Sequence, residues 1–196
     1  RLFFLSTHYR NPIDYNEKSI EDTNQALHRL YYTRERVAEI EKSGRIEPKT
    51  YGEAEEIEKN FYEAMDDDFN TALALSYIFE LSKMLNKMID DDPTLNAPFI
   101  LFTNRLFLSL ANTLGLLLDN LANFTTTEKI RHLNRIGISQ EALDTMIAER
   151  AEARKNKDYK TGDEIRNTLA GMGILLQDSP KGTEWRIKHI TMKGEG

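Results

Sequence analysis

The sequence of 196 residues contains no cysteine, and this absence removes several kinds of chemistry at once. Without thiols the chain cannot form disulfides, act through a cysteine nucleophile or hold zinc through cysteine ligands. A protein without disulfides suits a reducing compartment, so we expect a cytoplasmic location. No segment approaches the roughly 20 consecutive apolar residues that a membrane-spanning helix needs, so we expect no membrane partner.

Recognisable catalytic motifs are missing too. The histidines have neither an H-E-x-x-H motif nor a paired spacing for zinc, and we interpret them as surface or packing residues: His8, His28, His132 and His189. No serine or threonine stands in a nucleophile motif, and Gly171 and Gly173 indicate a helix stop rather than a phosphate-binding loop. These residues predict a binding module that holds no metal or cofactor itself.

Charge is distributed unevenly along the chain, although the net charge is only −6. Residues 1–149 contain 16 Lys and Arg against 25 Asp and Glu, whereas residues 150–196 contain 10 against 7. An acidic body with a basic end is typical of proteins in which that end meets a polyanion.

Helical periodicity dominates the first two thirds of the sequence. Apolar residues recur at three- and four-residue steps from Ser19 to about Lys42, from Tyr51 to Met65, and on to about Ile89. Pro98 suits the first turn of a further long helix. That helix carries this expected core stripe: Leu101, Phe102, Leu106, Leu110, Leu114 and Leu117. Long amphipathic helices with short links predict a mainly α protein built on an antiparallel helical bundle.

Three consecutive acids, Asp66, Asp67 and Asp68, allow two interpretations. They could chelate a divalent cation, but no further oxygen ligands follow with a suitable loop spacing. We favour a helix start, in which carboxylates cap free N–H groups and stabilise the positive end of the helix dipole.

The last third predicts a small α+β domain of two helices and a β-hairpin. Asn123 to Thr127 lacks periodicity and indicates a linker, and Ser139 is a good N-cap for the next helix. That helix should end near Asn156, and another should run from about Tyr159 to Gly171. Strand-like segments then flank S-P-K-G at residues 179–182, which is a hairpin pattern.

The stretch from Arg150 to Lys188 combines residue types suited to single-stranded RNA. Arginine and lysine bind phosphates, an exposed tyrosine stacks on a base, and carboxylates accept hydrogen bonds from base edges. The alternative is a solvated helix and hairpin with ordinary surface charges.

Three strings of residues resemble the C-terminal part of bacterial cysteinyl-tRNA synthetase. They are RLFFLSTHYRNP at residues 1–12, FYEAMDDDFNT at residues 61–71, and the stretch from Arg150 to Arg186. The likeness follows the order of the family and spans nearly the whole chain, although from Asn86 to about Glu128 it holds only in pattern.

The resemblance implies how the chain is divided and what is absent from it. In this family the catalytic domain comes first, with HIGH and KMSKS motifs, an ATP site and a zinc site, and none of these motifs occurs here. We therefore expect this chain alone to be inactive. Its parts would be a tail of the joining segment (1–16), a helical bundle (17–122), a linker (123–138) and an anticodon-binding domain (139–196).

The family's anticodon contacts carry over where its A-R-K-x-K-D-[WY]-x-x-x-D motif matches. The resemblance implies that Arg154, Tyr159 and Asp163 contact the anticodon, with Asp178 just before the hairpin turn. The sequence departs from the family at Tyr159, where relatives often have tryptophan, and at Gly162, where a small alanine-like residue is common. An intradomain Arg154–Asp163 ion pair is the structural alternative.

Further roles follow from chemistry beside these four residues. We expect phosphate contacts from these lysines: Lys155, Lys157, Lys160 and Lys181. Trp185 is more typical of hairpin core than of a stacking platform.

The implied partners are tRNA with the GCA anticodon of cysteine and the catalytic domain, and we expect a monomer. Two other functions remain open. The chain could belong to a related class I ligase, including a ligase-like enzyme that couples cysteine to a small molecule. It could also be a non-catalytic helical interaction module that uses its acidic bundle as the contact face.

Overall fold

The computed structural model describes residues 1–42, 45–179 and 182–188. The chain forms two compact units, Arg1–Leu121 and Ala122–Gly196. The first unit contains α1 (Leu2–Leu5), α2 (Glu17–Glu41), α3 (Gly52–Asp66), α4 (Thr71–Asp91) and α5 (Pro93–Thr113). The second contains α6 (Leu121–Ile136, beginning at the boundary), α7 (Gln140–Lys155), α8 (Tyr159–Gly171), β1 (Ile174–Ser179) and β2 (Gly182–Ile187). The predicted mainly α fold with one small hairpin is confirmed.

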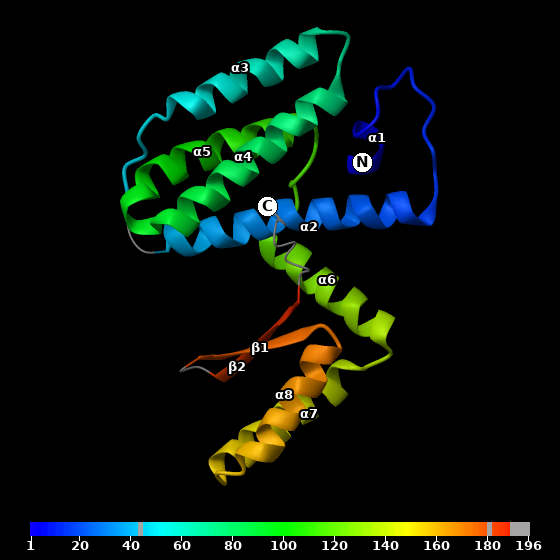
Figure 1. Ribbon diagram of the computed structural model, residues 1–196, viewed down its shortest axis with the longest axis vertical. Helices are drawn as coiled ribbons and strands as arrows, with labels where there is room; N and C mark the ends of the chain where they lie inside the picture. The colour runs from blue at the N-terminus through cyan, green and yellow to red at the C-terminus, as the bar shows by residue number, and fades with distance from the viewer. Residues whose placement is uncertain (43–44, 180–181, 189–196) are drawn as a thin grey trace. The chain divides into compact units, whose positions relative to one another are not determined.

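In the first unit, α4 packs against α2, α3 and α5 to form the helical bundle (Figure 1). The buried residues of α4 recur with helical spacing, at Leu75, Ile78, Leu81, Leu85 and Met88. A helix that contacts three neighbours buries most of its apolar surface, which is the main stabilising contribution to such a bundle. None of the helices in the described ranges is both long and apolar enough to cross a membrane.

A buried polar network fixes how α2 and α4 pack together. The Thr33 and Ser82 hydroxyls lie 2.7 Å apart, and Asn86 Nδ2 donates to Thr33 Oγ1 at 2.7 Å. Arg36 Nη1 donates to Asn86 Oδ1 at 2.8 Å. Because buried polar groups are costly when unpaired, this chain of bonds favours one register of the two helices over its neighbours.

The acidic triplet does not cap the helix that follows it, so the predicted helix start is wrong at these residues. Asp66 ends α3, and Asn70 caps α4 by accepting a hydrogen bond from the Leu73 N–H at 3.2 Å. Asp68 has a positive φ of 54° and faces the N-terminal segment. There its carboxylate accepts from the Tyr9 hydroxyl at 2.7 Å and pairs with Arg10 at 3.1 Å.

The start of α5 was placed too late by the sequence prediction. Asp92 caps this helix through the N–H groups of Thr94 and Leu95, Pro93 occupies its first turn, and Pro98 lies inside it. The buried face is also shifted relative to the expected stripe. Leu101, Phe102 and Leu106 are only half-buried, whereas these residues line the core: Ala97, Ile100, Thr103, Asn104, Phe107, Leu110 and Ala111.

Residues 123–127 are helical, which corrects the predicted non-helical linker. They belong to α6, whose buried residues Glu128, His132 and Leu133 come after the expected break. The threonines at 125–127 disfavour a helix only weakly, so packing of the later turns decides the conformation.

The second unit has its own core, centred on Leu133, Leu143, Leu169 and Ile174. In this unit α8 packs against both α7 and β1. The two strands pair antiparallel, with Ile174 opposite Ile187, Leu176 opposite Trp185, and Asp178 opposite Thr183. These three pairs share one face of the hairpin, because side chains alternate along a strand. The hairpin turn at residues 180–181 lies outside the described part of the chain.

Candidate nucleic-acid interface

A tight helix–helix corner joins α7 to α8. The Asp158 N–H bonds to Ala153 O at 2.8 Å and the Lys157 N–H to Arg154 O at 3.1 Å. These two backbone hydrogen bonds form the Schellman motif that ends many helices. The residue of that motif with left-handed backbone angles is usually glycine. Here Lys157 occupies that position with a φ of 60°. The corner therefore carries a lysine side chain at a position where glycine would be less strained.

The second helix of the corner begins at once. The Asp158 side chain accepts from the Thr161 N–H at 3.1 Å, and these hydrogen bonds to Thr161 lower the pKa of the Asp158 carboxyl. Tyr159 is the first residue of α8 and is 61% exposed. An aromatic ring held at a helix start with most of its surface in solvent offers a stacking face for a base.

Gly162 lets the two helices approach closely. It is buried, and a Cβ added there would lie 3.2 Å from Arg154 Cγ. The aliphatic part of the Arg154 side chain therefore runs over the Gly162 backbone. A larger residue at this position would move Arg154, so the glycine helps set where that cation is held.

Asp178 is the centre of the charged network at this site. Arg150 donates from Nη1 to Asp178 Oδ1 at 2.9 Å and from Nη2 to Asp178 Oδ2 at 2.8 Å. The Thr183 hydroxyl donates to Oδ1 at 2.8 Å, and Arg154 Nη1 lies 3.6 Å from Oδ2. One carboxylate at the end of the hairpin thus contacts two arginines of α7 and its cross-strand neighbour.

Hydrogen bonding shifts the pKa values of this network. Hydrogen bonds from Arg150 and then from Thr183 hold the pKa of the Asp178 carboxyl far below its usual range. The reciprocal bond to Asp178 raises the pKa of the Arg150 guanidinium, and the nearby charge of Asp163 adds to that rise. Asp178 and Arg150 are therefore both charged at neutral pH.

The structure brings together some of the residues predicted for the site. Arg154 and Asp178 form an ion pair, with 48% and 50% of their side chains exposed. Tyr159 and Asp163 are both exposed and one helical turn apart on α8. The Arg154–Asp163 ion pair that we considered is not among the salt bridges of the described residues, where Arg154 contacts Asp178 instead.

Three of the four predicted phosphate contacts lie at this corner. Lys155, Lys157 and Lys160 are all exposed, and Lys155 is 3.7 Å from Glu152 in a surface ion pair that should contribute little. Lys181, the fourth predicted phosphate contact, lies outside the described residues.

Arg150 was not singled out from the sequence, although it makes the strongest contacts in the network. It is 2% exposed, and its Nε is buried without a hydrogen-bond partner in the described structure. Its position one turn before Arg154 places both on the same face of α7, and that spacing was the available signal. Its partner Asp178, 28 residues further on, could not be found from spacing.

Two aromatic residues near the site have packing roles. Trp185 is partly buried against the Leu143–Leu169 cluster, with Lys129 Nζ 4.7 Å from its ring, so the prediction of hairpin core is confirmed. His132 is buried and its Nε2 donates to Met172 O at 2.9 Å, as expected of a packing histidine. His189 lies outside the described residues. Within the described ranges no group of three or more His, Asp and Glu side chains could hold a metal ion.

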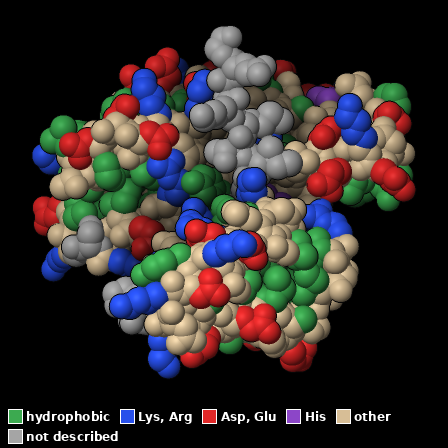
Figure 2. Space-filling view, turned by 60° about the horizontal axis from the view of Figure 1, so that its bottom comes forward, with side chains coloured by type: hydrophobic (Ala, Val, Ile, Leu, Met, Phe, Trp, Pro, Cys, Tyr) green, Lys and Arg blue, Asp and Glu red, His purple; other side chains and the backbone are tan. Residues whose placement is uncertain are grey.

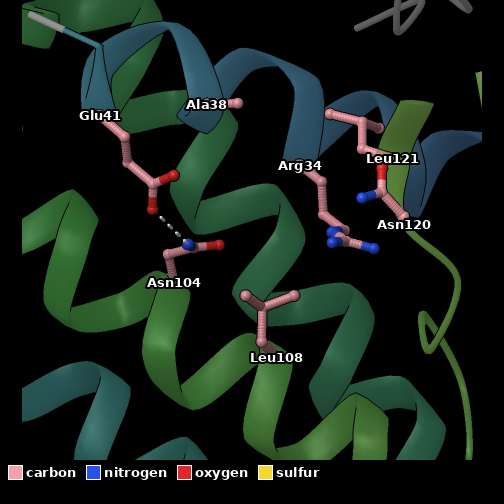
Figure 3. Close-up of a pocket in the computed structure, with 7 residues that line it drawn as sticks. All are labelled: Arg34, Ala38, Glu41, Asn104, Leu108, Asn120 and Leu121. Carbon is pink, nitrogen blue, oxygen red and sulfur yellow. Dashed lines mark hydrogen bonds between the residues drawn. The ribbon is translucent and has the colours of Figure 1, made fainter.

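A polar pocket lies in the bundle between α2 and α5 (Figure 3), with a volume of about 240 Å³. Most of its polar groups serve the fold. Arg34 Nη1 donates to the Leu117 and Asp119 carbonyls at 3.1 and 3.0 Å, and Asn104 Nδ2 donates to Glu41 at 3.4 Å. Among the residues that the structure describes, none is a hydrogen-bond partner of the buried Asn104 Oδ1, so a water molecule would suit it.

Positive and negative side chains are mixed on one face of the molecule. On the face drawn in Figure 2, Lys and Arg side chains are interspersed with Asp and Glu, and no continuous basic area covers it.

Two known families match the chain. Residues 60–119 match the DALR domain, and residues 139–186 match the cysteinyl-tRNA ligase anticodon binding domain. The second match contains Arg150, Arg154, Tyr159, Asp163 and Asp178. The site built above from contacts and exposure thus lies entirely within it.

The chain is also similar to cysteine–tRNA ligases along almost its full length. It is 38% identical over 194 residues to the enzyme of Geobacter sp. strain M21, and 36% identical over 196 residues to that of Thermodesulfovibrio yellowstonii. Each alignment covers 96% of this chain and 40% of the relative. The enzyme of Alkalilimnicola ehrlichii is 37% identical over 95% of the chain. The chain thus spans about 40% of the length of these relatives, and the predicted resemblance is confirmed.

Proposed function

Because the chain combines a DALR domain with a cysteinyl-tRNA ligase anticodon binding domain, we propose that it is the tRNA-binding, anticodon-reading part of a cysteine–tRNA ligase. The observation that carries this proposal is the α7–α8 corner. It holds an exposed ring, Tyr159, at the start of α8 and a half-exposed guanidinium, Arg154, near the end of α7 that pairs with the carboxylate of Asp178.

Each group at the corner has a chemical role toward an unpaired anticodon. Tyr159 stacks on one base, and the guanidinium of Arg154 donates to acceptor edges such as O6 and N7 of guanine. Asp163 accepts from a donor edge. Asp178 has acceptor capacity left at Oδ2, which takes one close hydrogen bond, so it can also accept from an exocyclic amine.

The predicted phosphate-binding lysines supply a contribution to affinity that does not depend on the RNA sequence. Lys155, Lys157, Lys160 and Lys181 neutralise phosphates of the anticodon loop, which strengthens binding of every tRNA alike. Discrimination then rests on Arg154, Tyr159, Asp163 and Asp178. This division of roles lets affinity and specificity be measured separately.

The chemical reaction belongs to the remainder of the enzyme. Cysteine activation with ATP, transfer to the tRNA, and the zinc that selects cysteine would all lie in the catalytic domain, outside these residues. The chain by itself would then bind tRNA, as a monomer in the cytoplasm, without charging it. Among the alternatives, a ligase acting on a small molecule has no anticodon to read, and a purely structural helical module would not explain the match of residues 139–186 to an anticodon binding domain.

A filter-binding titration tests the proposal directly. The chain is titrated against tRNA transcripts that carry the GCA anticodon, each single-base variant of it, and an unrelated anticodon. We expect the GCA transcript to bind most tightly, with each mismatch weakening binding by about 1–3 kcal/mol, as for single-base changes in nucleic-acid sites. Equal affinity for all transcripts would show that the corner does not read the anticodon.

A further inference from the structure

We propose that Arg150 is a positioning residue for anticodon discrimination, although it touches no RNA itself. By holding Asp178 with both of its terminal nitrogens, Arg150 keeps Asp178 from capturing Arg154, whose guanidinium then stays available to a base. This inference rests on the proposed function, since it assigns a cause to discrimination at the same site.

The first step is that Arg150 cannot act on RNA directly. It is 2% exposed, and it lies below a hairpin end whose Asp178 is half exposed. A buried guanidinium can influence a ligand only through the groups that it holds. The two groups within its reach are Asp178, at 2.9 and 2.8 Å, and, through its charge, Asp163. Both are predicted base-reading carboxylates.

The second step is the limited acceptor capacity of Asp178. A carboxylate has about four lone-pair sites. Oδ1 already accepts from Arg150 and Thr183, and Oδ2 accepts from Arg150, while Arg154 stays at 3.6 Å from Oδ2. That distance is a loose ion pair rather than a hydrogen bond. Two arginines of α7 thus compete for one carboxylate, and the buried one holds it.

The third step is what happens when Arg150 is removed. Asp178 keeps its charge and loses its two strongest donors, while Arg154 is the nearest remaining cation. A small side-chain rotation closes the 3.6 Å gap between Arg154 Nη1 and Asp178 Oδ2, and Arg154 then forms the bidentate ion pair with Asp178. Its donors are then directed at the protein instead of at a base. The same change occupies Oδ2, the acceptor that Asp178 would offer to an amine.

The geometry also explains why lysine cannot replace arginine here. The planar fork reaches both oxygens of Asp178 at once, whereas an ammonium group reaches one. Arg150 Nε is buried without a hydrogen-bond partner in the described structure. The side chain is therefore oriented so that its two terminal nitrogens bind Asp178, at the cost of one unpaired donor. A lysine would keep the charge but leave Oδ2 open to Arg154.

The experiment compares discrimination ratios in the full chain. Binding of the GCA transcript and its single-base variants is measured for wild type, Arg150→Met, Arg150→Lys, Arg154→Ala and the Arg150→Met/Arg154→Ala double variant. Arg166→Met, which removes an exposed arginine of α8 with no place in the site, is the matched control. Circular dichroism fixes a temperature at which each variant is folded. Arg150→Lys and, if needed, Arg150→Gln replace Arg150→Met should it not fold.

The expected result is a shared loss. Arg154→Ala lowers the preference for one base by about 5- to 150-fold, the range for a bidentate contact. Arg150→Met lowers the same preference to a similar extent, and the double variant is no worse than Arg154→Ala within about twofold, the usual error of additivity. The slope of binding against salt stays at the wild-type value in Arg150→Met, because phosphate contacts are untouched.

Two outcomes would overturn the inference in distinguishable ways. If Arg150→Met unfolds more easily but keeps the wild-type preference, Arg150 only stabilises the fold. If the two arginine substitutions lower the preference additively, Arg150 does not act through Arg154. Failure of the proposed function looks different, because wild type itself would then bind all anticodon variants equally.

Discussion

Arg150 and Asp178 are 28 residues apart in sequence, yet two parallel hydrogen bonds join their side chains. The pair attaches the end of the hairpin to α7. Because Arg150 is buried, loss of its partner would leave a desolvated charge without compensation. The contact therefore stabilises the second unit as well as ordering its exposed corner.

Asp178→Asn should destabilise the second unit in a pH-dependent way. The folded-state pKa of Asp178 is lowered, so its contribution is present above the unfolded value of about 4 and is lost as pH falls through the folded value. We expect the variant to lose about 1.5–3 kcal/mol of stability at pH 7, the range for hydrogen bonds to charged groups. Urea denaturation followed by circular dichroism at pH 7 and pH 3 measures this, with Asp144→Asn as the control. A difference from wild type that is as large at pH 3 as at pH 7 would contradict this assignment.

Tyr159→Ala should weaken RNA binding without unfolding the chain. Loss of one base–aromatic stack costs about 1–3 kcal/mol of binding free energy. Stability should change by less than about 0.5 kcal/mol, because the ring is 61% exposed. Tyr159→Trp should bind at least as tightly as wild type, and Tyr62→Ala, an exposed aromatic on α3, serves as the control. The stacking role is excluded if Tyr159→Ala binds the GCA transcript as wild type does.

Lys155→Ala and Lys160→Ala should weaken binding of all transcripts to the same extent. Each removes one phosphate contact, which flattens the slope of log binding constant against log salt by roughly 0.7 for single-stranded RNA. Titrations at several salt concentrations measure the slope, and Lys83→Ala on α4 is the matched control. A change confined to one anticodon variant would instead point to base reading by the lysine.

Asp163→Ala should relax discrimination at a single anticodon position. Its exposed carboxylate lies one turn after Tyr159, so it is expected to accept from the edge of one base. We expect the preference at that base to fall by about 1–3 kcal/mol while the other two positions keep theirs. Titration of the single-base variants identifies the position. A uniform loss across all variants would mean that Asp163 contributes only to general affinity or to folding.

Lys157→Gly should move stability and RNA binding in opposite directions. Lys157 has a φ of 60°, a conformation that costs an L-residue about 1 kcal/mol or more and costs glycine almost nothing. Glycine also gains freedom in the unfolded chain, so we expect stability to rise by at most about 1 kcal/mol. Binding should weaken, because a cation at the corner is lost. Thermal unfolding and filter binding together test this, and unchanged binding would remove Lys157 from the interface.

The second unit was largely predictable from sequence because its boundaries are set by local chemistry. Ser139 accepts from the Ala142 N–H as a cap, and α8 begins at Tyr159 and ends at Gly171 as expected. Caps, glycine stops and a hairpin pattern act over a few residues, so they can be recognised without tertiary information. The site residues on α7 and α8 followed from the same helix positions together with the family resemblance.

The bundle was harder to predict in detail because α5 is apolar on several faces. This helix packs against α2, α3 and α4 and carries apolar residues on more than one face. In the sequence, Leu101, Phe102 and Leu106 therefore form as clear an apolar stripe as the residues that are buried. Similarly, Asp68 pairs with Arg10, 58 residues away, and this contact decides its role more than its position before a helix does. Long-range contacts of this kind leave no periodic trace in the sequence.

Of the described apolar side chains, Leu133, Leu143, Leu169 and Ile174 form the entire fully enclosed centre of the second unit. A centre that small leaves a narrow margin between the folded and unfolded forms. Any RNA that binds the folded form alone adds its binding free energy to that margin. Binding of tRNA and folding of this unit are therefore coupled. A destabilising substitution far from the corner, at Leu143 for example, would lower the apparent affinity for tRNA before it lowered the amount of protein.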